Sequence, residues 1–394
     1  MKTHQWFSLL SRKQYAWFLG TVTLMVMIIG TGIVLNPPTM PENVVNVSIE
    51  MSIRDMAPKL NVTGKALARE LDLPLDVSKT KPLSALGVQT ETLQHAAHHL
   101  LSHRDTTLKY YVYAAFVLGG LVFLVRLGRP DQSDVKHRSQ WYPRTPYIMF
   151  LLGSVIVAGF LLGKSPNPME GAVKVFKSMV GLYPDPTFKV IAFLFFIVLA
   201  VLGNKLICGW ACPFGALQEL IYSIPVLKGI KKRKFPFALT NTIRGILFAV
   251  MLLFLFGIVG SRKGMVLYHY INPFNLFNFD FETISIVLTI ILALFGSFLV
   301  YRPFCQLICP FGFLSWVAER FSITRVCIDK EKCTQCGACI TACPLTAAEG
   351  RVHGKRLPAD CFSCARCLNV CPFDAIQYKY VLNKGRTKPS TSTE

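Results

Sequence analysis

Long apolar runs separated by short polar segments dominate the chain up to about residue 301. A helix needs about 20 mostly apolar residues to cross a bilayer, and runs near that length recur along this sequence. Six of them predict spanning helices, of which the second and third are short. They cover residues 17–35, 110–125, 147–162, 188–207, 243–259 and 284–301. We therefore expect a polytopic α-helical membrane protein with about six transmembrane helices.

Basic residues cluster beside alternate apolar runs. Arg12 and Lys13 precede the first run, and further basic residues fill the loops after the second and fourth runs. Cytoplasmic loops carry such an excess of Lys and Arg, so we expect both termini in the cytoplasm. The first run has no small-residue cleavage site before Asn36, which indicates an uncleaved anchor. The basic loop residues are Arg126, Arg129, Lys136, Arg138 and Arg144, then Lys228, Lys231, Lys232, Arg233 and Lys234.

The segment between the first two runs, residues 36–109, has a mixed polar pattern. Within it, residues 64–71 and 90–101 carry apolar positions three or four apart, which predicts two helices of a small extracytoplasmic unit. Four histidines share one face of the second helix, where they would suit a metal or a haem iron. A wetted polar face opposite the apolar positions is the favoured interpretation. The four are His95, His98, His99 and His103.

The composition agrees with a membrane protein. Hydrophobic residues make up 52% of the chain and charged residues 16%, below the roughly 25% charged share of soluble domains. The net charge of +20 lies in short clusters between apolar runs rather than along one stripe, so it predicts membrane orientation and no nucleic-acid partner. The thirteen cysteines favour a reducing compartment around the C-terminal region.

Beyond residue 323, eight cysteines follow the pattern C-x2-C-x2-C-x3-C-P twice. This is the spacing of bacterial two-cluster ferredoxins, in which the fourth cysteine of each run binds the other cluster. Zinc knuckles and disulfides are the alternatives, but this tandem spacing is typical of neither. We therefore expect a C-terminal α+β two-cluster bacterial ferredoxin domain. One [4Fe–4S] cluster is assigned to Cys333, Cys336, Cys339 and Cys371, and the second to Cys361, Cys364, Cys367 and Cys343.

Four more cysteines form a second repeat, C-x3-C-P-F-G, just past the fourth and sixth apolar runs. An amphipathic stretch follows each copy, so we expect the hairpins of the third and fourth and of the fifth and sixth helices to be two copies of one unit, with related sites near the repeat interface. At the membrane surface the four thiolates would hold a third cluster or form a thiol/disulfide relay, and buried structural cysteines are the remaining interpretation. The copies contain Cys208 with Cys212 and Cys305 with Cys309, whereas Cys327 has no partner in either pattern.

These patterns divide the chain into six segments. An N-terminal transmembrane anchor and the helical insert are followed by the second helix with its basic loop. The repeated hairpins then lead into the ferredoxin domain and a disordered tail. The expected boundaries are 1–35, 36–109, 110–146, 147–322, 323–380 and 381–394.

The two C-x3-C-P motifs on membrane hairpins, followed by the double ferredoxin motif, resemble the NapH/NosR-type membrane polyferredoxins. The resemblance covers about residues 147–378. It implies a protein of the bacterial inner membrane that transfers electrons for respiratory reductases, such as those of nitrate or nitrous oxide, or that takes part in their maturation. Two features of this chain differ from those proteins. Residues 36–109 are too short for the flavin-binding domain of NosR-type chains, and the first two helices are additional to the NapH type.

The sequence shows no hydride- or phosphate-binding loop and no catalytic triad, which indicates an electron-transfer component rather than a stand-alone catalyst. We predict a membrane-bound relay of single electrons between a cytoplasmic donor or the quinone pool and a reductase or cytochrome partner. The alternatives are an accessory protein that matures or reactivates an extracytoplasmic metalloenzyme, and a membrane redox sensor. Direct transfer across the bilayer is not expected, because the roughly 30 Å hydrocarbon core would have to be crossed without a carrier.

Overall fold

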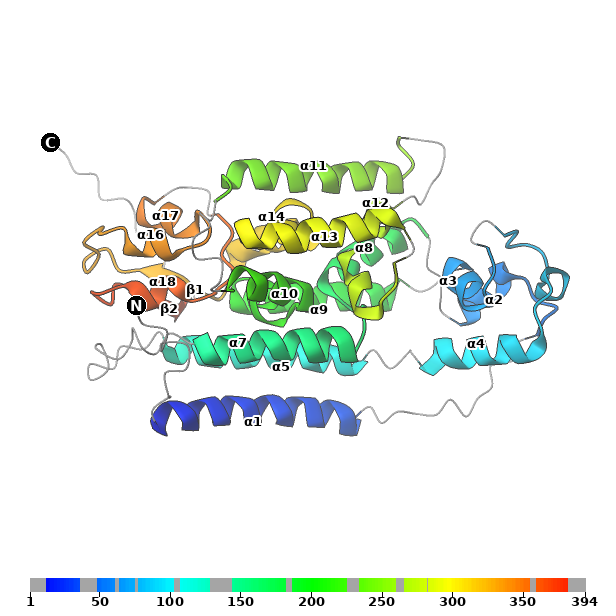
Figure 1. The fold of residues 1–394 in the computed structure, drawn as a ribbon, viewed down its shortest axis with the longest axis horizontal. Helices are drawn as coiled ribbons and strands as arrows, with labels where there is room; N and C mark the ends of the chain where they lie inside the picture. Colours follow the sequence, from blue (N-terminus) through cyan, green and yellow to red (C-terminus); the bar gives the residue numbers. More distant parts are fainter. Residues whose placement is uncertain are drawn as a thin grey trace.

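The computed structural model arranges the chain as a helical bundle with a small unit at each end (Figure 1). The C-terminal unit lies at one end of the bundle and the insert between the first two long helices lies at the other. The described residues are 12–35, 48–60, 64–74, 77–102, 107–127, 144–181, 186–224, 234–259, 266–281, 283–354 and 359–381. Most of the two basic loops and of the tail therefore lies outside the described residues.

Six long helical segments lie side by side in the bundle. They are α1 (Arg12–Leu35), α5 (Thr107–Leu127), α7 (Arg144–Gly153) continued by η4 (Ser154–Leu161), α9 (Thr187–Gly203), α11 (Phe237–Leu255) and α13 (Ile284–Leu299). By length and composition, α1, α5 and α11 are apolar enough to cross a membrane, and the other three are shorter apolar helices. The structure thus supports a helical membrane protein with three candidate spans. That all six helices cross the membrane stays a prediction.

The fourth and fifth long helices differ from their predicted bounds. The run expected to continue to residue 207 ends at Gly203, because Asn204 and Lys205 adopt left-handed conformations with φ of 51° and 62°. Residues Ile207–Ala211 then form a separate π-helical turn, η5. The helix expected to begin at residue 243 begins at Phe237, since polar Asn241 and buried Arg244 interrupt its apolar pattern without breaking the helix.

Each C-x3-C-P-F-G motif leads into a short helix that packs inside the bundle. α10 (Pro213–Tyr222) follows the first motif and contacts α7, η4 and α13. In the second copy α14 (Pro303–Leu307) precedes α15 (Pro310–Ala318), which continues as η8 (Glu319–Phe321). α15 contacts α9, α11 and the loop helix α8 (Pro168–Met179). The motif proline is the first residue of both α10 and α15, where its missing N–H leaves no hydrogen bond unmade. The two predicted amphipathic stretches are thus helical.

The insert folds around a core of its own at the far end of the bundle. It contains α2 (Ile53–Lys59), α3 (Gly64–Glu70), η2 (Leu83–Leu86) and α4 (Thr90–Ser102), which confirms both predicted helices. Apolar side chains such as Ile53, Leu67 and Leu93 are fully buried among them. Of the four histidines, His95 is exposed on α4; the side chains of His98 and His99, and all of His103, lie outside the described residues.

Short helices of the bundle loops lie near the insert end. α8 (Pro168–Met179) begins after Asn167, whose Oδ1 accepts a hydrogen bond from the backbone N–H of Glu170 at 2.9 Å. α12 (Leu267–Tyr270) and η7 (Pro273–Asn278) come from the loop between α11 and α13. Phe277 of η7 packs against Gly159 of η4 so closely that a Cβ there would lie 2.6 Å from its ring. These loops close the bundle at this end.

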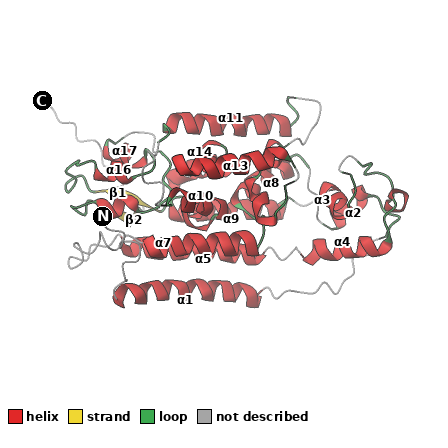
Figure 2. Ribbon diagram, viewed as in Figure 1, coloured by secondary structure: helices red, strands yellow, loops and turns green. Residues whose placement is uncertain are grey.

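The C-terminal unit is α+β, as the cysteine pattern predicts. Strands β1 (Thr324–Ile328) and β2 (Ile376–Tyr380) pair antiparallel, with Thr324 opposite Tyr380. The helices α16 (Ala338–Ala342), α17 (Ala347–Val352) and α18 (Arg366–Val370) lie between them in the chain, and Figure 2 shows the strands at this end of the molecule. Cys327 lies on β1 and is half-buried.

Candidate functional site

Two cavities of the C-terminal unit are each lined by four cysteines. The first, which we name the bundle-side cavity, has about 530 Å³ of empty space and is otherwise lined mainly by apolar side chains. The second, the solvent-side cavity, has about 350 Å³. The bundle-side cysteines are Cys343, Cys361, Cys364 and Cys367, and the solvent-side cysteines are Cys333, Cys336, Cys339 and Cys371. Each cavity therefore collects three cysteines of one run and the fourth of the other.

The two cysteine runs adopt the same backbone turns around their cavities. Gln335 and Gly337 have φ of 55° and 75°, and Ser363 and Ala365 have φ of 50° and 61° at the same two positions of the second run. A left-handed turn is unusual for residues other than glycine, so its repetition shows that the loops are shaped alike. The sequence interpretation of two equivalent runs agrees with this geometry, and that each cavity holds a cluster stays a prediction here.

The bundle-side cysteines are buried, and burial affects their protonation. Burial raises the pKa of the Cys364 thiol to about 12, and the nearby Arg366 opposes that change only in part. Because a metal ligand must be the thiolate, cluster binding would displace these protons. At the solvent-side cavity, the backbone N–H of Ala375 lies 3.3 Å from Cys371 Sγ and donates to it. Hydrogen bonds of this kind tune the potential of a bound cluster.

The bundle-side cavity is attached directly to the helical bundle. Gly209 approaches the Phe362 carbonyl so closely that a Cβ there would lie 2.1 Å from the oxygen. Trp210 Nε1 donates to the Ser363 carbonyl at 3.1 Å, and Ser363 Oγ donates to the Asn204 carbonyl at 2.9 Å. In contrast, Cys336 of the solvent-side cavity is exposed. One four-cysteine set thus contacts the bundle while the other lies near solvent.

Buried charges join the C-terminal unit to the two membrane repeats. Lys205, after α9, and Arg244, on α11, both pair with Asp360, and the Arg244 Nη2 to Asp360 Oδ2 distance is 2.8 Å. Arg302, after α13, pairs with Glu219 of α10 at 3.1 Å, and Arg366 of the C-terminal unit pairs with the same carboxylate. Buried charges need such partners because leaving one unpaired is costly. The contacts fix the C-terminal unit on the bundle.

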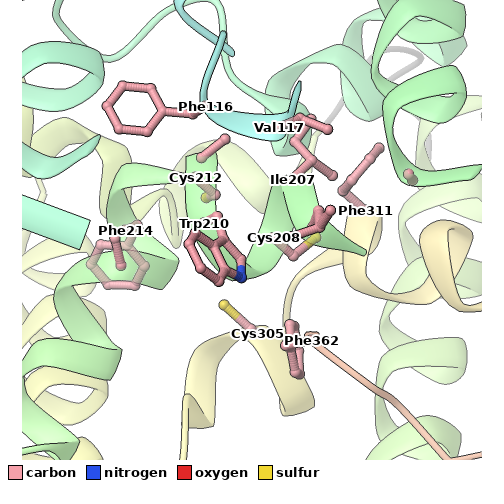
Figure 3. Packing of buried hydrophobic residues seen from close by; sticks show 14 of the residues in the cluster. Phe116, Val117, Ile207, Cys208, Trp210, Cys212, Phe214, Cys305, Phe311 and Phe362 are labelled. Carbon is pink, nitrogen blue, oxygen red and sulfur yellow. The ribbon is translucent and has the colours of Figure 1, made fainter. Parts of the chain in front are cut away.

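The four cysteines of the membrane repeats, which we name the repeat quartet, come together inside the bundle. Cys208, Cys212, Cys305 and Cys309 lie close enough for their charges to act on one another. Figure 3 shows three of them around Trp210. The structure places them among buried side chains, and that they lie at the membrane surface stays a prediction. The left-handed residues Lys205 and Arg302 turn the chain back, so each motif re-enters the bundle.

Several buried partners of the repeat quartet were missed by the sequence analysis, although their spacing repeats. Lys205 and Arg302 each stand three residues before the first cysteine of a motif, and Gln218 and Ser315 each stand six residues after the second. Aligning the two copies around their cysteines would have found these positions. Among the described residues, no group of three or more His, Cys, Asp or Glu side chains is drawn together tightly enough for a single metal ion.

Comparison with protein families identifies two iron–sulfur regions. Residues 186–236 match a family described as "4Fe-4S binding domain", and residues 303–347 match one described as "4Fe-4S dicluster domain". The first region contains Cys208 and Cys212 of the repeat quartet. The second contains Cys305 and Cys309 together with the first ferredoxin run. The chain is therefore an iron–sulfur protein.

Characterised relatives are similar over part of their length. The ferredoxin-type protein NapH of Haemophilus influenzae is 31% identical over 44% of this chain and 59% of its own. The putative electron transport protein YccM of Escherichia coli is 24% identical over 38% of this chain and 44% of its own. The regulatory protein NosR of Stutzerimonas stutzeri is 29% identical over 37% of this chain and 20% of its own. The chain thus spans less than two thirds of each. No solved structure matches.

Proposed function

Because the chain belongs to the NapH/NosR-type membrane polyferredoxins, we propose that it relays single electrons between a cytoplasmic donor or the quinone pool and a respiratory reductase. The observation that carries this proposal is the pair of four-cysteine cavities, one near solvent and one against the bundle. When bound there, [4Fe–4S] clusters supply one-electron transfer. Relatives named as ferredoxin-type and electron transport proteins support an iron–sulfur electron-transfer role.

The two cavities suggest an order of transfer. The exposed Cys336 loop gives a soluble partner access to the solvent-side set of cysteines. The Cys361–Cys364 loop contacts the turn that begins the first membrane motif, through Ser363 and Trp210. A soluble donor or acceptor would therefore meet the solvent-side set, and the bundle-side set would connect it with the membrane part of the chain.

We place the protein in the bacterial inner membrane, with six spanning helices and the ferredoxin domain in the cytoplasm. Two features support this orientation. α1 begins at the end of the bundle that carries the ferredoxin domain, and α5 begins at the end that carries the insert (Figure 1). The end of α5 and the start of α7, which adjoin one of the basic segments of the sequence, lie at the ferredoxin end (Figure 1), as expected for a cytoplasmic loop. The insert would then face the other side, where a reductase or cytochrome partner is within reach.

Anaerobic purification in detergent tests the proposed function. We expect at least about eight irons per chain, four for each ferredoxin cluster, with EPR signals that appear on reduction. A quinol analogue or a reduced soluble ferredoxin should then reduce these clusters without any other protein. A chain that binds iron but exchanges electrons with neither donor would contradict the relay. That result would favour an accessory or regulatory role, the latter being the role in the name of the NosR relative.

A further inference from the structure

The repeat quartet is built by reciprocal contacts between the two membrane motifs. Gln218 of the first repeat donates from Nε2 to Cys305 Sγ of the second at 3.3 Å, and Lys205 of the first donates to the Gly312 carbonyl of the second at 3.2 Å. Arg302 donates to the Gly209 carbonyl at 2.8 Å. Each repeat thus completes the surroundings of the other. Neither motif forms this site alone.

The sulfur atoms of the repeat quartet are surrounded by donors and cations. The backbone N–H groups of Gly215 and Gly312 lie close enough to Cys212 and Cys309, the second cysteine of each motif, to act on their sulfur atoms. A Cβ on either glycine would lie 2.7 Å from the carbonyl of the first cysteine, so the turn is too tight for any side chain. The fully buried cations Lys205, Arg244 and Arg302 lie near the first cysteines. An iron–sulfur cluster on four thiolates is anionic, and these groups would stabilise it, although Asp360 and Glu219 already pair with the three cations.

Two buried hydroxyl groups beside the repeat quartet have no hydrogen-bond partner among the described residues. They belong to Tyr113 of α5 and Tyr268 of α12, each almost completely buried. Tyr113 lies close enough to Cys212, and Tyr268 to Cys309, for their charges to interact. An unmade hydrogen bond in the interior costs about 1–3 kcal/mol, so such groups usually have an acceptor. The sulfur atoms of a cluster on the quartet would provide one for each tyrosine.

The repeat quartet lies near the middle of the bundle. Ser154, close to the centre of the α7–η4 segment, donates to the carbonyl of Ala211 beside Cys212 at 2.7 Å. The ring of Phe311 in the second motif contacts Phe196 of α9, with centroids 6.3 Å apart. Seven residues separate Phe196 from the end of α9 at Gly203, which corresponds to about 10 Å along the helix. A carrier here would divide the roughly 30 Å hydrocarbon core into two shorter steps.

We propose that the repeat quartet binds one iron–sulfur cluster shared by the two repeats, and that this site carries electrons across the membrane core. The inference rests on the proposed function of the ferredoxin domain. Cys343, Cys361, Cys364 and Cys367 would hold the electron donor, and the repeat quartet would hold a group that accepts one electron from it. A one-electron acceptor at the insert end would then take up that electron, which leaves the quartet site oxidised again. No bond to substrate is made, and an ion moving across the membrane balances the charge.

Iron content and EPR test the site in the full-length chain. We expect about twelve irons in the wild type, and about eight in Cys208→Ser and Cys309→Ser variants that keep both ferredoxin signals. Cys327→Ser is the matched control, because this cysteine lies on β1 outside all three sets, and it should keep about twelve. Eight irons in the wild type, unchanged in Cys208→Ser, would overturn the proposal and leave the ferredoxin function intact. If the wild type showed no ferredoxin EPR signals, the proposed function itself would be contradicted.

The hydroxyl groups of Tyr113 and Tyr268 allow a second test, which measures the midpoint potential of the proposed cluster. Tyr113→Phe and Tyr268→Phe should retain the third EPR signal but lower its midpoint potential, because a hydrogen bond donated to sulfur stabilises the more negative, reduced state. The potentials of the two ferredoxin signals should not change in these variants. Equal shifts of all three potentials, or no shift of any, would contradict the placement of the tyrosines beside the cluster.

Transfer across the bilayer is tested with sealed proteoliposomes that contain ferricyanide. Dithionite is added outside, and valinomycin with potassium prevents a membrane potential from building up. The wild type should reduce the enclosed ferricyanide, and Cys208→Ser should slow this reduction at least tenfold while its ferredoxin clusters are still reduced. If the variant reduced ferricyanide as fast as the wild type, the repeat quartet would not lie on the electron path.

Discussion

Replacing Arg302 tests how strongly the two membrane repeats depend on one buried cation. Its guanidinium is fully buried, pairs with the buried Glu219 at 3.1 Å and donates to the Gly209 carbonyl at 2.8 Å. Removing one partner of a buried ion pair costs about 3–5 kcal/mol, because the other charge is left uncompensated. Glu219 keeps Arg366 as a second partner, so we expect the lower end of that range, about 3 kcal/mol, for Arg302→Ala.

The matched control is Arg366→Ala, which removes the other cation from the same carboxylate. The Arg366 side chain is 21% exposed, so water replaces part of its interaction and we expect a loss of about 1 kcal/mol. Pulse proteolysis of the detergent-solubilised protein across a denaturant series would measure both free energies of unfolding. Combining Arg302→Ala with Glu219→Gln should cost less than the sum of the two single losses, since both changes remove the same ion pair. If Arg302→Ala were no more destabilising than Arg366→Ala, the buried-charge argument would be refuted.

Two further predictions concern the attachment and the cysteine sets of the ferredoxin domain. Gly209→Ala should loosen the domain and make it more sensitive to protease, because the new Cβ would meet the Phe362 carbonyl at 2.1 Å; Gly20→Ala, with nothing within 4 Å, should have no such effect. Cys371→Ser should alter the EPR signal of the solvent-side cluster and Cys343→Ser that of the bundle-side cluster, and the reverse result would show that each run binds its own cluster.

The elements that follow from local pattern were well predicted. The α+β ferredoxin unit and the two insert helices agree with the structure, since cysteine spacing and apolar periodicity depend on short stretches of chain. Helix ends were less accurate. The run predicted to reach residue 207 stops at Gly203, because a left-handed turn at Asn204 leaves the apolar pattern unchanged. Hydrophobicity alone cannot detect a change in backbone direction.

The cysteine sites show the same division between local and long-range information. Spacing within each run was enough to predict which four cysteines line each ferredoxin cavity, because the known crossed arrangement accompanies that spacing. The repeat quartet was recognised as a repeat, but the contacts that join its two halves were not. Its position depends on Lys205 and Arg302, which turn each motif inward and cross to the other repeat.

The sequence by itself therefore determined the kind of protein: apolar runs made it a helical membrane protein, and cysteine spacing made its end an iron–sulfur domain. Only the tertiary structure decided that the two membrane motifs meet inside the bundle, with Tyr113 and Tyr268 beside them. The physical reason is that spacing records contacts between neighbours in the chain. The quartet is instead formed by contacts between segments about a hundred residues apart, such as that of Gln218 with Cys305, which no local pattern encodes.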